Sequence, residues 1–346
     1  PLHLWLPPAH AGAPAAASAV LSALVVKGSW FLVARLWFDV MPGVVTLSAA
    51  QVLGVLGAGA IVFGSVVALR QERLKLLVAY STMAQIGYLF LMFPLAFDVA
   101  GQLAAPGPAL TGGLLQVVSH ATAKAGMFMA AGLIYAAIGH DRITDLAGVA
   151  RVLPVSALAL AVAGLALMGV VPSGTYMAKK LMLDAADASG QWWWTVVLQG
   201  GAVFTAGYVV LTLFAVGRRA PAPVRLAKPV SRLAEWVALA LSLASLLLVF
   251  AVPDTIPAES PVSALSLDNF VMLAVLCLGG VLLVFGLSAR SWRGAGSSDV
   301  VRRPVTDVLG ASLERADGFI RRWPSATASL LLLVMLLGVL LGGRST

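Results

Sequence analysis

The sequence is poor in charge and almost free of cysteine. Only 11% of its 346 residues are charged and 60% are hydrophobic, whereas a soluble domain carries about 25% charged residues. This composition predicts a polytopic membrane protein. The single cysteine, Cys277, excludes a disulfide framework and a cysteine-based metal site. We interpret it as a small buried hydrophobic residue.

Sequence patterns of known catalytic and cofactor sites are also missing. There is no P-loop and no HExxH, CxxC or GxSxG motif. The histidines His3, His10, His120 and His140 do not have the spacing of metal ligands. We therefore expect no catalytic centre, no cofactor and no metal in this chain, and we interpret His3 and His10 as structural. If the chain serves an oxidoreductase, the electron chemistry belongs to partner subunits.

The net charge of +8 does not indicate a nucleic-acid partner. The arginines lie almost entirely in polar connectors, as in Arg218-Arg219 and Arg321-Arg322. Basic connectors beside hydrophobic segments are typical of membrane proteins, where they face the side on which positive charge is retained. The expected surroundings are a lipid bilayer.

Long apolar segments predict an all-α fold with about ten transmembrane helices, because a spanning helix needs about 20 apolar residues. Nine segments are long enough, and a tenth, shorter one, Gly174 to Ala186, follows a Pro-Ser-Gly break. The nine are Ala15 to Phe38, Val45 to Leu69, Leu76 to Phe97, Leu114 to Ile138, Leu153 to Val171, Trp192 to Val216, Leu233 to Val252, Phe270 to Leu287 and Ala326 to Leu341.

The chain divides into two predicted regions. Residues 1–217 hold the buried lysines, and residues 218–346 add further transmembrane helices. Apolar residues at helical spacing predict an amphipathic helix at 306–323, lying on the membrane surface or along a partner. Because the sequence opens at Pro1 rather than Met, we expect it to lack an N-terminal membrane portion.

Lysines in the hydrophobic segments are the main functional signal. Lys27 lies about twelve residues, or ~18 Å of helix, from either end of its segment. A cation at such depth is costly and commonly marks an ion pathway or proton relay. The alternative interpretation is a structural pair with a buried carboxylate.

A second lysine belongs to a polar stripe. Gln116, His120 and Lys124 follow one another at four-residue spacing, so they share one helix face. Histidine titrates nearest neutral pH, and this favours a proton relay over an interhelical hydrogen-bond patch.

Further candidates lie on two other segments. Of the adjacent Lys179 and Lys180, we expect Lys179 to face the interior. Lys75 stands at the edge of its span, where it either supports the relay or reaches the surface. Relay support is also predicted for Tyr80, Ser81, Gln85 and Gln116.

Carboxylates are missing from the span centres. Glu235 and the other acidic residues lie at segment ends or in connectors. Buried lysines normally need partners, so we expect theirs to come from outside this sequence or to be replaced by water.

Four motifs follow one another along residues 1 to about 215. They are Pro1-Leu2-His3-Leu4-Trp5-Leu6-Pro7-Pro8-Ala9-His10 with Ala13-Pro14 and Val26-Lys27, Leu74 to Thr82 with Gln85-Ile86-Gly87-Tyr88, Ser119-His120-Ala121 with Lys124-Ala125 and Phe128, and Pro172 to Lys179. Together they resemble motifs of the antiporter-like membrane subunits of NADH:quinone oxidoreductase, Mrp-type cation/proton antiporters and group 4 hydrogenases. The last motif is most similar to Mrp D-type and hydrogenase-linked members.

The resemblance implies a bundle of about fourteen helices with inverted repeats and broken helices. It implies that Lys27, Lys124 and Lys179 are the first-half, linking and second-half relay lysines and that His120 is the linking histidine. The family's first-half glutamate is absent from this sequence, and Gln116 stands where some members have a second histidine.

The expected function is proton translocation within a multi-subunit membrane complex, with coupling to Na⁺ or K⁺ left open, in a bacterial inner membrane. Two alternatives remain. One is a non-conducting scaffold or energy-coupling subunit, for example of a carbon-uptake complex, and the other is a subunit contributing to a quinone pocket.

Overall fold

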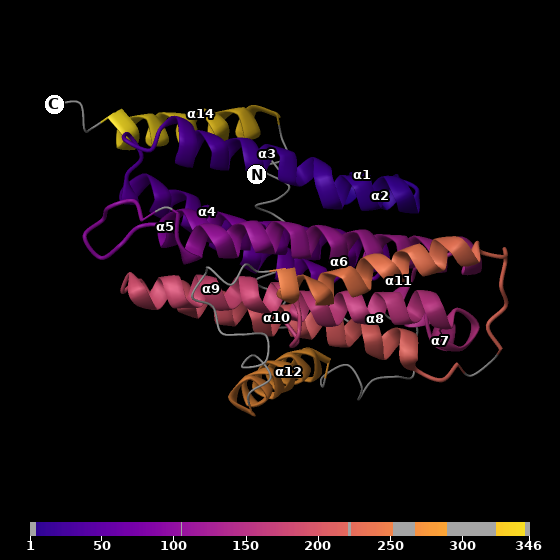
Figure 1. Ribbon diagram of the computed structural model, residues 1–346. Coiled ribbons are helices and arrows are strands. Elements are labelled where there is room, and N and C mark those ends of the chain that lie inside the picture. Colours follow the sequence, from indigo (N-terminus) through magenta and orange to yellow (C-terminus); the bar gives the residue numbers. More distant parts are fainter. Residues whose placement is uncertain (1–4, 105, 221–222, 252–266, 289–322, 343–346) are drawn as a thin grey trace.

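The computed structural model describes residues 5–104, 106–220, 223–251, 267–288 and 323–342. These residues form a helical bundle whose long elements run side by side (Figure 1). The helices of the bundle are α1 (Leu6–Gly12), α2 (Ala15–Val20), α3 (Val26–Arg35), α4 (Leu47–Leu69), α5 (Leu74–Leu95), α6 (Pro108–Ile138), α7 (Val149–Val152), α8 (Pro154–Met168), α9 (Gly174–Ala188) and α10 (Trp192–Gly217).

Helix α5 lies at the centre of the bundle and is packed by α4, α6 and α1. It is the most enclosed of the candidate spans, because 78% of its most apolar 18-residue stretch is buried. Leu74, Leu77, Val78 and Ala79 are fully buried, so apolar residues cover every side of the helix. A helix that is apolar all round belongs in the interior, and the polar side chains on α5 are therefore interior as well.

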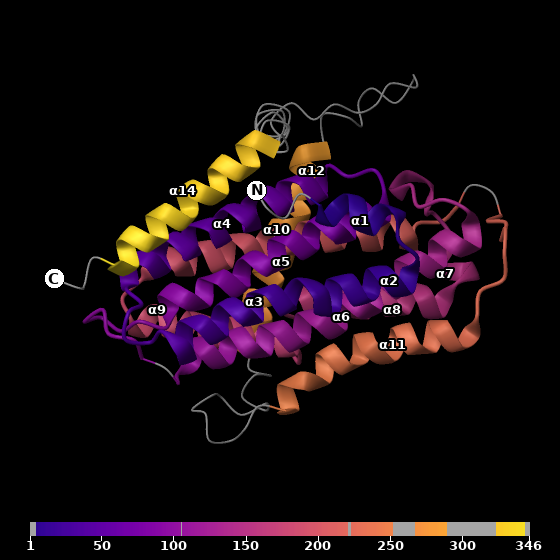
Figure 2. The same cartoon turned by 90° about the horizontal axis from the view of Figure 1, so that it is seen from above.

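Three later helices lie at the periphery. Helix α11 (Arg232–Leu247) packs along α6 and α8, α12 (Leu267–Ser288) packs on α10, and α14 (Trp323–Gly342) lies against α4 (Figure 2). Their outer faces are rich in exposed leucine and valine, for example Leu332 and Val339. Such faces suit contact with lipid.

The predicted all-α polytopic membrane fold is confirmed. Six helical segments in the described part of the chain are long and apolar enough to span a bilayer: Ala15–Val40, Leu47–Leu69, Leu74–Leu95, Pro108–Ile138, Trp192–Gly217 and Arg232–Phe250. The apolar stretches of α8, α12 and α14 are shorter. The predicted amphipathic helix at 306–323 lies outside the described residues, apart from Trp323, and the division at residue 217 stays a prediction.

The break predicted before Lys179 separates α8 from α9. Helix α8 ends at Met168, and Gly169 takes a left-handed conformation with φ of 85°, which glycine adopts without steric cost. Helix α9 begins five residues later, with the Ser173 hydroxyl accepting from the amide of Tyr176 at 3.1 Å. Each helix has 15 residues, so each is shorter than a full crossing.

A second irregularity precedes Lys27. Between α2 and α3 the chain forms η1 (Leu21–Val25), a single π-helical turn, and η2 (Leu36–Val40) follows α3. Such π turns are rare and are frequent at functional sites. The sequence gives no signal for this π turn. Gly28 lies after the turn, and a Cβ added at Gly28 would have open space around it.

Helices α4 and α5 approach each other across glycines. A Cβ on Gly57 would lie 2.6 Å from the carbonyl oxygen of Gly87, and one on Gly64 would lie 2.6 Å from the backbone nitrogen of Ala84. Small residues at this contact let the backbones approach closely, as is typical of membrane helices.

This contact gives a prediction with a control on the same helix. We expect Gly57→Ala to destabilise the protein by about 1–3 kcal/mol, because backbone atoms of α5 must move to admit the methyl group. Gly59 is exposed and has open space around it, so Gly59→Ala should leave the unfolding temperature in detergent unchanged or slightly higher. Equal melting temperatures for the two variants would contradict the packing described here.

Candidate functional site

Lys124 lies on α6 and is completely buried against α5. Its Nζ donates to Ser81 Oγ at 2.5 Å and to the carbonyl oxygen of Val78 at 3.1 Å. Ser81 Oγ in turn donates to the same carbonyl at 2.9 Å. The ammonium group is therefore held by neutral oxygens, and one of the predicted support residues, Ser81, contacts it directly.

Lys27 is connected to this part of α5 through Ser22. Its Nζ donates to the carbonyl oxygen of Ser22, within the π turn. The Ser22 and Thr82 hydroxyls lie 3.1 Å apart in a hydrogen bond, and Thr82 Oγ1 donates to the carbonyl oxygen of Val78 at 2.9 Å. Buried hydroxyls thus link the surroundings of Lys27 to those of Lys124.

One turn further along α5, two glutamines form the next polar cluster. Gln116 Nε2 donates to Gln85 Oε1 at 3.0 Å, and Gln85 Nε2 donates to Thr205 Oγ1 and Tyr208 Oη at 3.2 Å each. The cluster brings together α5, α6 and α10 in a fully buried position. It satisfies the Gln85 amide in an apolar interior, where an unpaired amide is costly.

The lysines, hydroxyls and glutamines described above form a buried polar row. Lys179, on α9 after the helix break, continues this row. It is 8% exposed, and its Nζ lies 5.0 Å from the centroid of the Tyr88 ring, within the range of a cation–π contact. No hydrogen-bond acceptor for Nζ is present among the described residues. Lys180, its neighbour, is half-exposed, so the structure buries the lysine that the sequence favoured.

His120 lies beside the row with unused polar atoms. It is fully buried, and neither ring nitrogen has a hydrogen-bond partner within the described part of the chain. The neighbouring Ser119 hydroxyl faces the start of α9, where a Cβ on Gly174 would overlap it. Buried polar atoms without protein partners are normally satisfied by ordered water, so this region suits a hydrated interior.

Lys75 is buried in the first turn of α5 rather than extended into solvent. Its Nζ donates to the carbonyl oxygen of Ala13 at 2.8 Å and lies 5.1 Å from the centroid of the Tyr135 ring. Its backbone amide donates to Asp141 Oδ2 at 3.3 Å, while Arg73 pairs with Asp141 Oδ1 at 2.9 Å. This end of α5 is therefore fastened to the loop after α6.

Lys27, Lys124 and Lys179 form no ion pair with an acidic residue in the described part of the chain. The ion pairs seen there include Arg35 with Asp39 and Arg73 with Asp141, and none involves Lys27, Lys124 or Lys179. Neutral oxygens and a ring face stand in for counter-ions, so gain or loss of a proton would leave no carboxylate unpaired.

The structure places most of the predicted site residues together and adds connecting residues that the sequence did not indicate. Ser81, Gln85 and Gln116 lie in the polar row, whereas Tyr80 is half-buried and packs against the main apolar core. The missed residues are Ser22, Thr82, Thr205 and Tyr208. Only α5 carries a sequence pattern that could have indicated such connecting residues, because its positions 78, 81, 82, 85 and 88 lie on one helix face.

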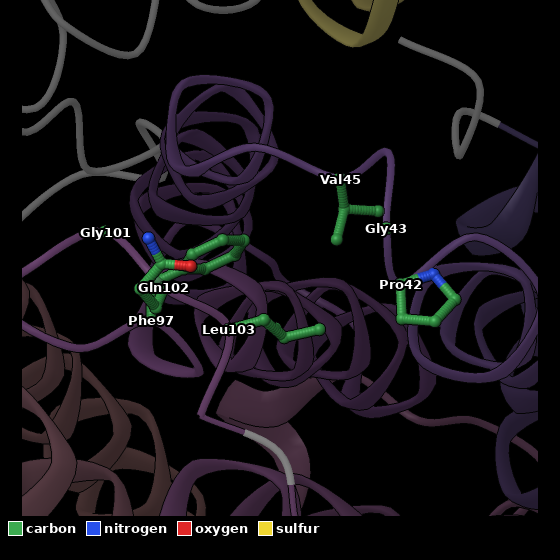
Figure 3. A pocket seen from close by; sticks show the side chains of 7 residues that line it. All are labelled: Pro42, Gly43, Val45, Phe97, Gly101, Gln102 and Leu103. Atoms are coloured by element: carbon green, nitrogen blue, oxygen red, sulfur yellow. The ribbon is translucent and has the colours of Figure 1, made fainter. Parts of the chain in front are cut away.

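A surface pocket lies away from these residues. It has a volume of about 360 Å³ and opens between the loop before α4 and the loop after α5 (Figure 3). Its lining is Pro42, Gly43, Val45, Phe97, Gly101, Gln102 and Leu103. These side chains include no titratable group, so we assign the pocket no part in the candidate site.

The fold and site define a polytopic membrane protein with lysines and hydroxyls joined through its interior. Residues 1–205 match the family described as NADH:quinone oxidoreductase/Mrp antiporter, transmembrane region. Because this match covers more than half of the chain, the protein belongs to that family.

Curated relatives are similar over the same part of the chain. NADH-quinone oxidoreductase subunit N of Desulforudis audaxviator is 34% identical over 60% of this chain and 40% of its own length. A probable K⁺/H⁺ antiporter component of Rhizobium meliloti is 35% identical over 54% of this chain and 17% of its own. The chain spans about two fifths of the length of the oxidoreductase relatives it matches.

Solved structures share the fold at lower identity. A structure of the Mrp complex from Dietzia sp. DQ12-45-1b aligns with a TM-score of 0.62 at 22% identity, covering 84% of this chain and 57% of that one. Respiratory complex I from Thermus thermophilus with bound NADH gives 0.60 at 24%, covering 82% and 55%. These likenesses establish the architecture.

The burial of Lys124 predicts an unusual effect on stability. We expect Lys124→Met to leave the unfolding temperature in detergent unchanged or to raise it, because removing a buried cation saves its desolvation cost. Ser81 keeps its bond to the Val78 carbonyl, so no buried acceptor is orphaned. Lys228→Met, at an exposed position, is the control. A fall of many degrees for Lys124→Met alone would mean that the ammonium group is structural.

Proposed function

We propose that this chain carries protons across a membrane through the buried row of lysines, hydroxyls and amides, within a multi-subunit complex. One observation carries the proposal: Ser22 accepts from Lys27 through its carbonyl and contacts Thr82 through its hydroxyl, while Thr82 and Lys124 both donate to the Val78 carbonyl. Neither lysine has an acidic partner in the described residues. A lysine held by neutral oxygens can give up its proton without leaving a buried anion.

The relay is formed by Lys27, His120, Lys124 and Lys179. Each lysine alternates between ammonium and amine, and each transfer moves one proton along hydroxyls and water. Two ammonium groups in a medium of low dielectric constant repel strongly. A proton that arrives at one lysine therefore favours release from the next. The direction is set by a driver elsewhere in the complex that changes the local field.

The relatives suggest the surroundings in which such a relay would work. Their names include subunits of quinone oxidoreductases and of a K⁺/H⁺ antiporter. We propose that the chain assembles with other membrane subunits, that its location is a bacterial inner membrane, and that proton movement is coupled to Na⁺ or K⁺ where the complex is of the antiporter kind.

The first test removes the two lysines at the ends of the glutamine cluster. In liposomes containing the purified complex, we expect Lys124→Met and Lys179→Met to lower proton uptake at least about a hundredfold, because each removes a proton carrier. Lys180→Met is the control for Lys179→Met, since the two positions are adjacent. A pH-sensitive dye measures uptake, and subunit content measures assembly.

The outcomes separate the candidate functions. Normal uptake by assembled Lys124→Met and Lys179→Met complexes would refute the relay. A scaffold would lose assembly while uptake per assembled complex stayed constant. A quinone pocket would be revealed by labelling of this chain with a photoreactive quinone analogue.

The second test addresses the hydroxyl link. Thr82 and Thr212 are both buried, and each donates to the carbonyl four residues before it, but only Thr82 meets Ser22. We expect Thr82→Val to slow proton uptake roughly two- to tenfold, the kinetic equivalent of one hydrogen bond. Thr212→Val should leave the rate unchanged. Equal rates for the two variants would place the proton path elsewhere.

A further inference from the structure

A buried histidine outside the proposed relay lies on α1, against the helices that carry Lys75 and Lys124. His10, on α1, is fully buried and stacks on Phe128 of α6 with ring centroids 4.3 Å apart and planes inclined by 13°. Neither of its ring nitrogens has a hydrogen-bond partner among the described residues. The sequence suggested only a structural role for this histidine.

Three lysines, each on a different helix, lie close enough to His10 for their charges to act on it. Phe128, which supports the ring, lies one turn after Lys124 on α6. Lys75, at the start of α5, donates to the carbonyl of Ala13, three residues after His10. Burial, followed by the charges of Lys124, Lys27 and Lys75, lowers the pKa of His10 to about 4. Its imidazole is therefore neutral at pH 7, with one N–H donor and one free lone pair.

A packing role alone does not account for this side chain. Two unsatisfied buried ring atoms destabilise the folded protein when nothing binds them, and a phenylalanine would stack on Phe128 without that cost. The ring plane is set by the stacking, while the carbonyl of His10 is held by Ser18 Oγ at 3.3 Å. The residue is thus positioned, and its nitrogens are left for water or a proton.

We propose that His10 is a further relay residue, which passes protons between Lys75, at the N-terminal end of α5, and Lys124 in the interior. The proposal rests on the proton-carrying function proposed above. One proton enters at the unprotonated ring nitrogen, and one leaves from the other nitrogen. The imidazole ends as the opposite tautomer, and a half-turn of the ring or a return transfer restores it. Bridging water completes the links to the lysines.

The position of Lys75 makes it a suitable proton donor to His10. Its neighbour Arg73 is 42% exposed and pairs with Asp141, whereas Lys75 itself is 5% exposed. Lys75 therefore stands where α5 passes from the surface to the interior. His10 offers the next titratable group inward, because α1 packs directly on α5 (Figure 2).

The test uses the assembled complex in liposomes with a pH-sensitive dye. We expect His10→Phe to preserve stacking and assembly and to lower proton uptake at least about tenfold, the smaller end of general acid–base effects. His140→Phe is the matched control, since His140 is exposed, and its rate should equal that of the wild type. Normal uptake by assembled His10→Phe would overturn the proposal.

Chemical rescue covers the case in which His10→Phe fails to assemble. His10→Ala leaves a space of imidazole size, and added imidazole should restore much of the lost uptake. Because imidazole itself carries protons across membranes, Lys124→Met receives the same addition and should show no rescue. If imidazole raises the rate of His10→Ala by no larger a factor than it raises the rate of Lys124→Met, the proposal is overturned.

Comparison with Lys124→Met also separates the two proposals. If Lys124→Met is inactive while His10→Phe is normal, only the role of His10 is wrong. If Lys124→Met conducts normally, the relay itself is refuted, whatever His10→Phe does.

Discussion

The shared carbonyl oxygen of Val78 is the interaction on which the interior depends. It accepts from Ser81, Thr82 and Lys124, so one backbone atom joins two side chains of α5 to a cation of α6. A carbonyl has two lone pairs, and its partners must share them. A proton moving at Lys124 therefore changes the bonding of both hydroxyls, and the polar cluster responds as one unit.

That arrangement requires α5 to be enclosed. Water at the surface of the helix would compete for the same lone pairs and would screen the lysine charges. The glycine contacts with α4 bring one side of the enclosure close, and α1 and α6 close other sides. Tight packing therefore keeps bulk water away from the polar interior, so that the charges there interact strongly.

Much of the fold could be predicted from the sequence, because long apolar segments are a strong indication of membrane-spanning helices. The burial of Lys27, Lys124 and Lys179 could likewise be predicted, because these lysines lie within apolar segments, whereas their part in a relay stays a prediction. Ser22, Thr205 and Tyr208 were missed because isolated hydroxyls are common in membrane helices and only tertiary packing decides which of them meet. The burial of Lys75 was open for a related reason: a position at the edge of a span has two outcomes, and the carbonyl of Ala13, supplied by a distant turn, decided between them.

The π turn at Leu21–Val25 carries information in its length rather than in its residues. It holds one residue more than an α-helical turn would, and this rotates everything after Val25 by about 100° relative to a regular helix. Substitution within these five residues would leave that rotation in place, whereas deleting any one of them would swing the side chain of Lys27 to a different face. The number of residues in the π turn therefore sets the helix face on which the buried cation of Lys27 lies.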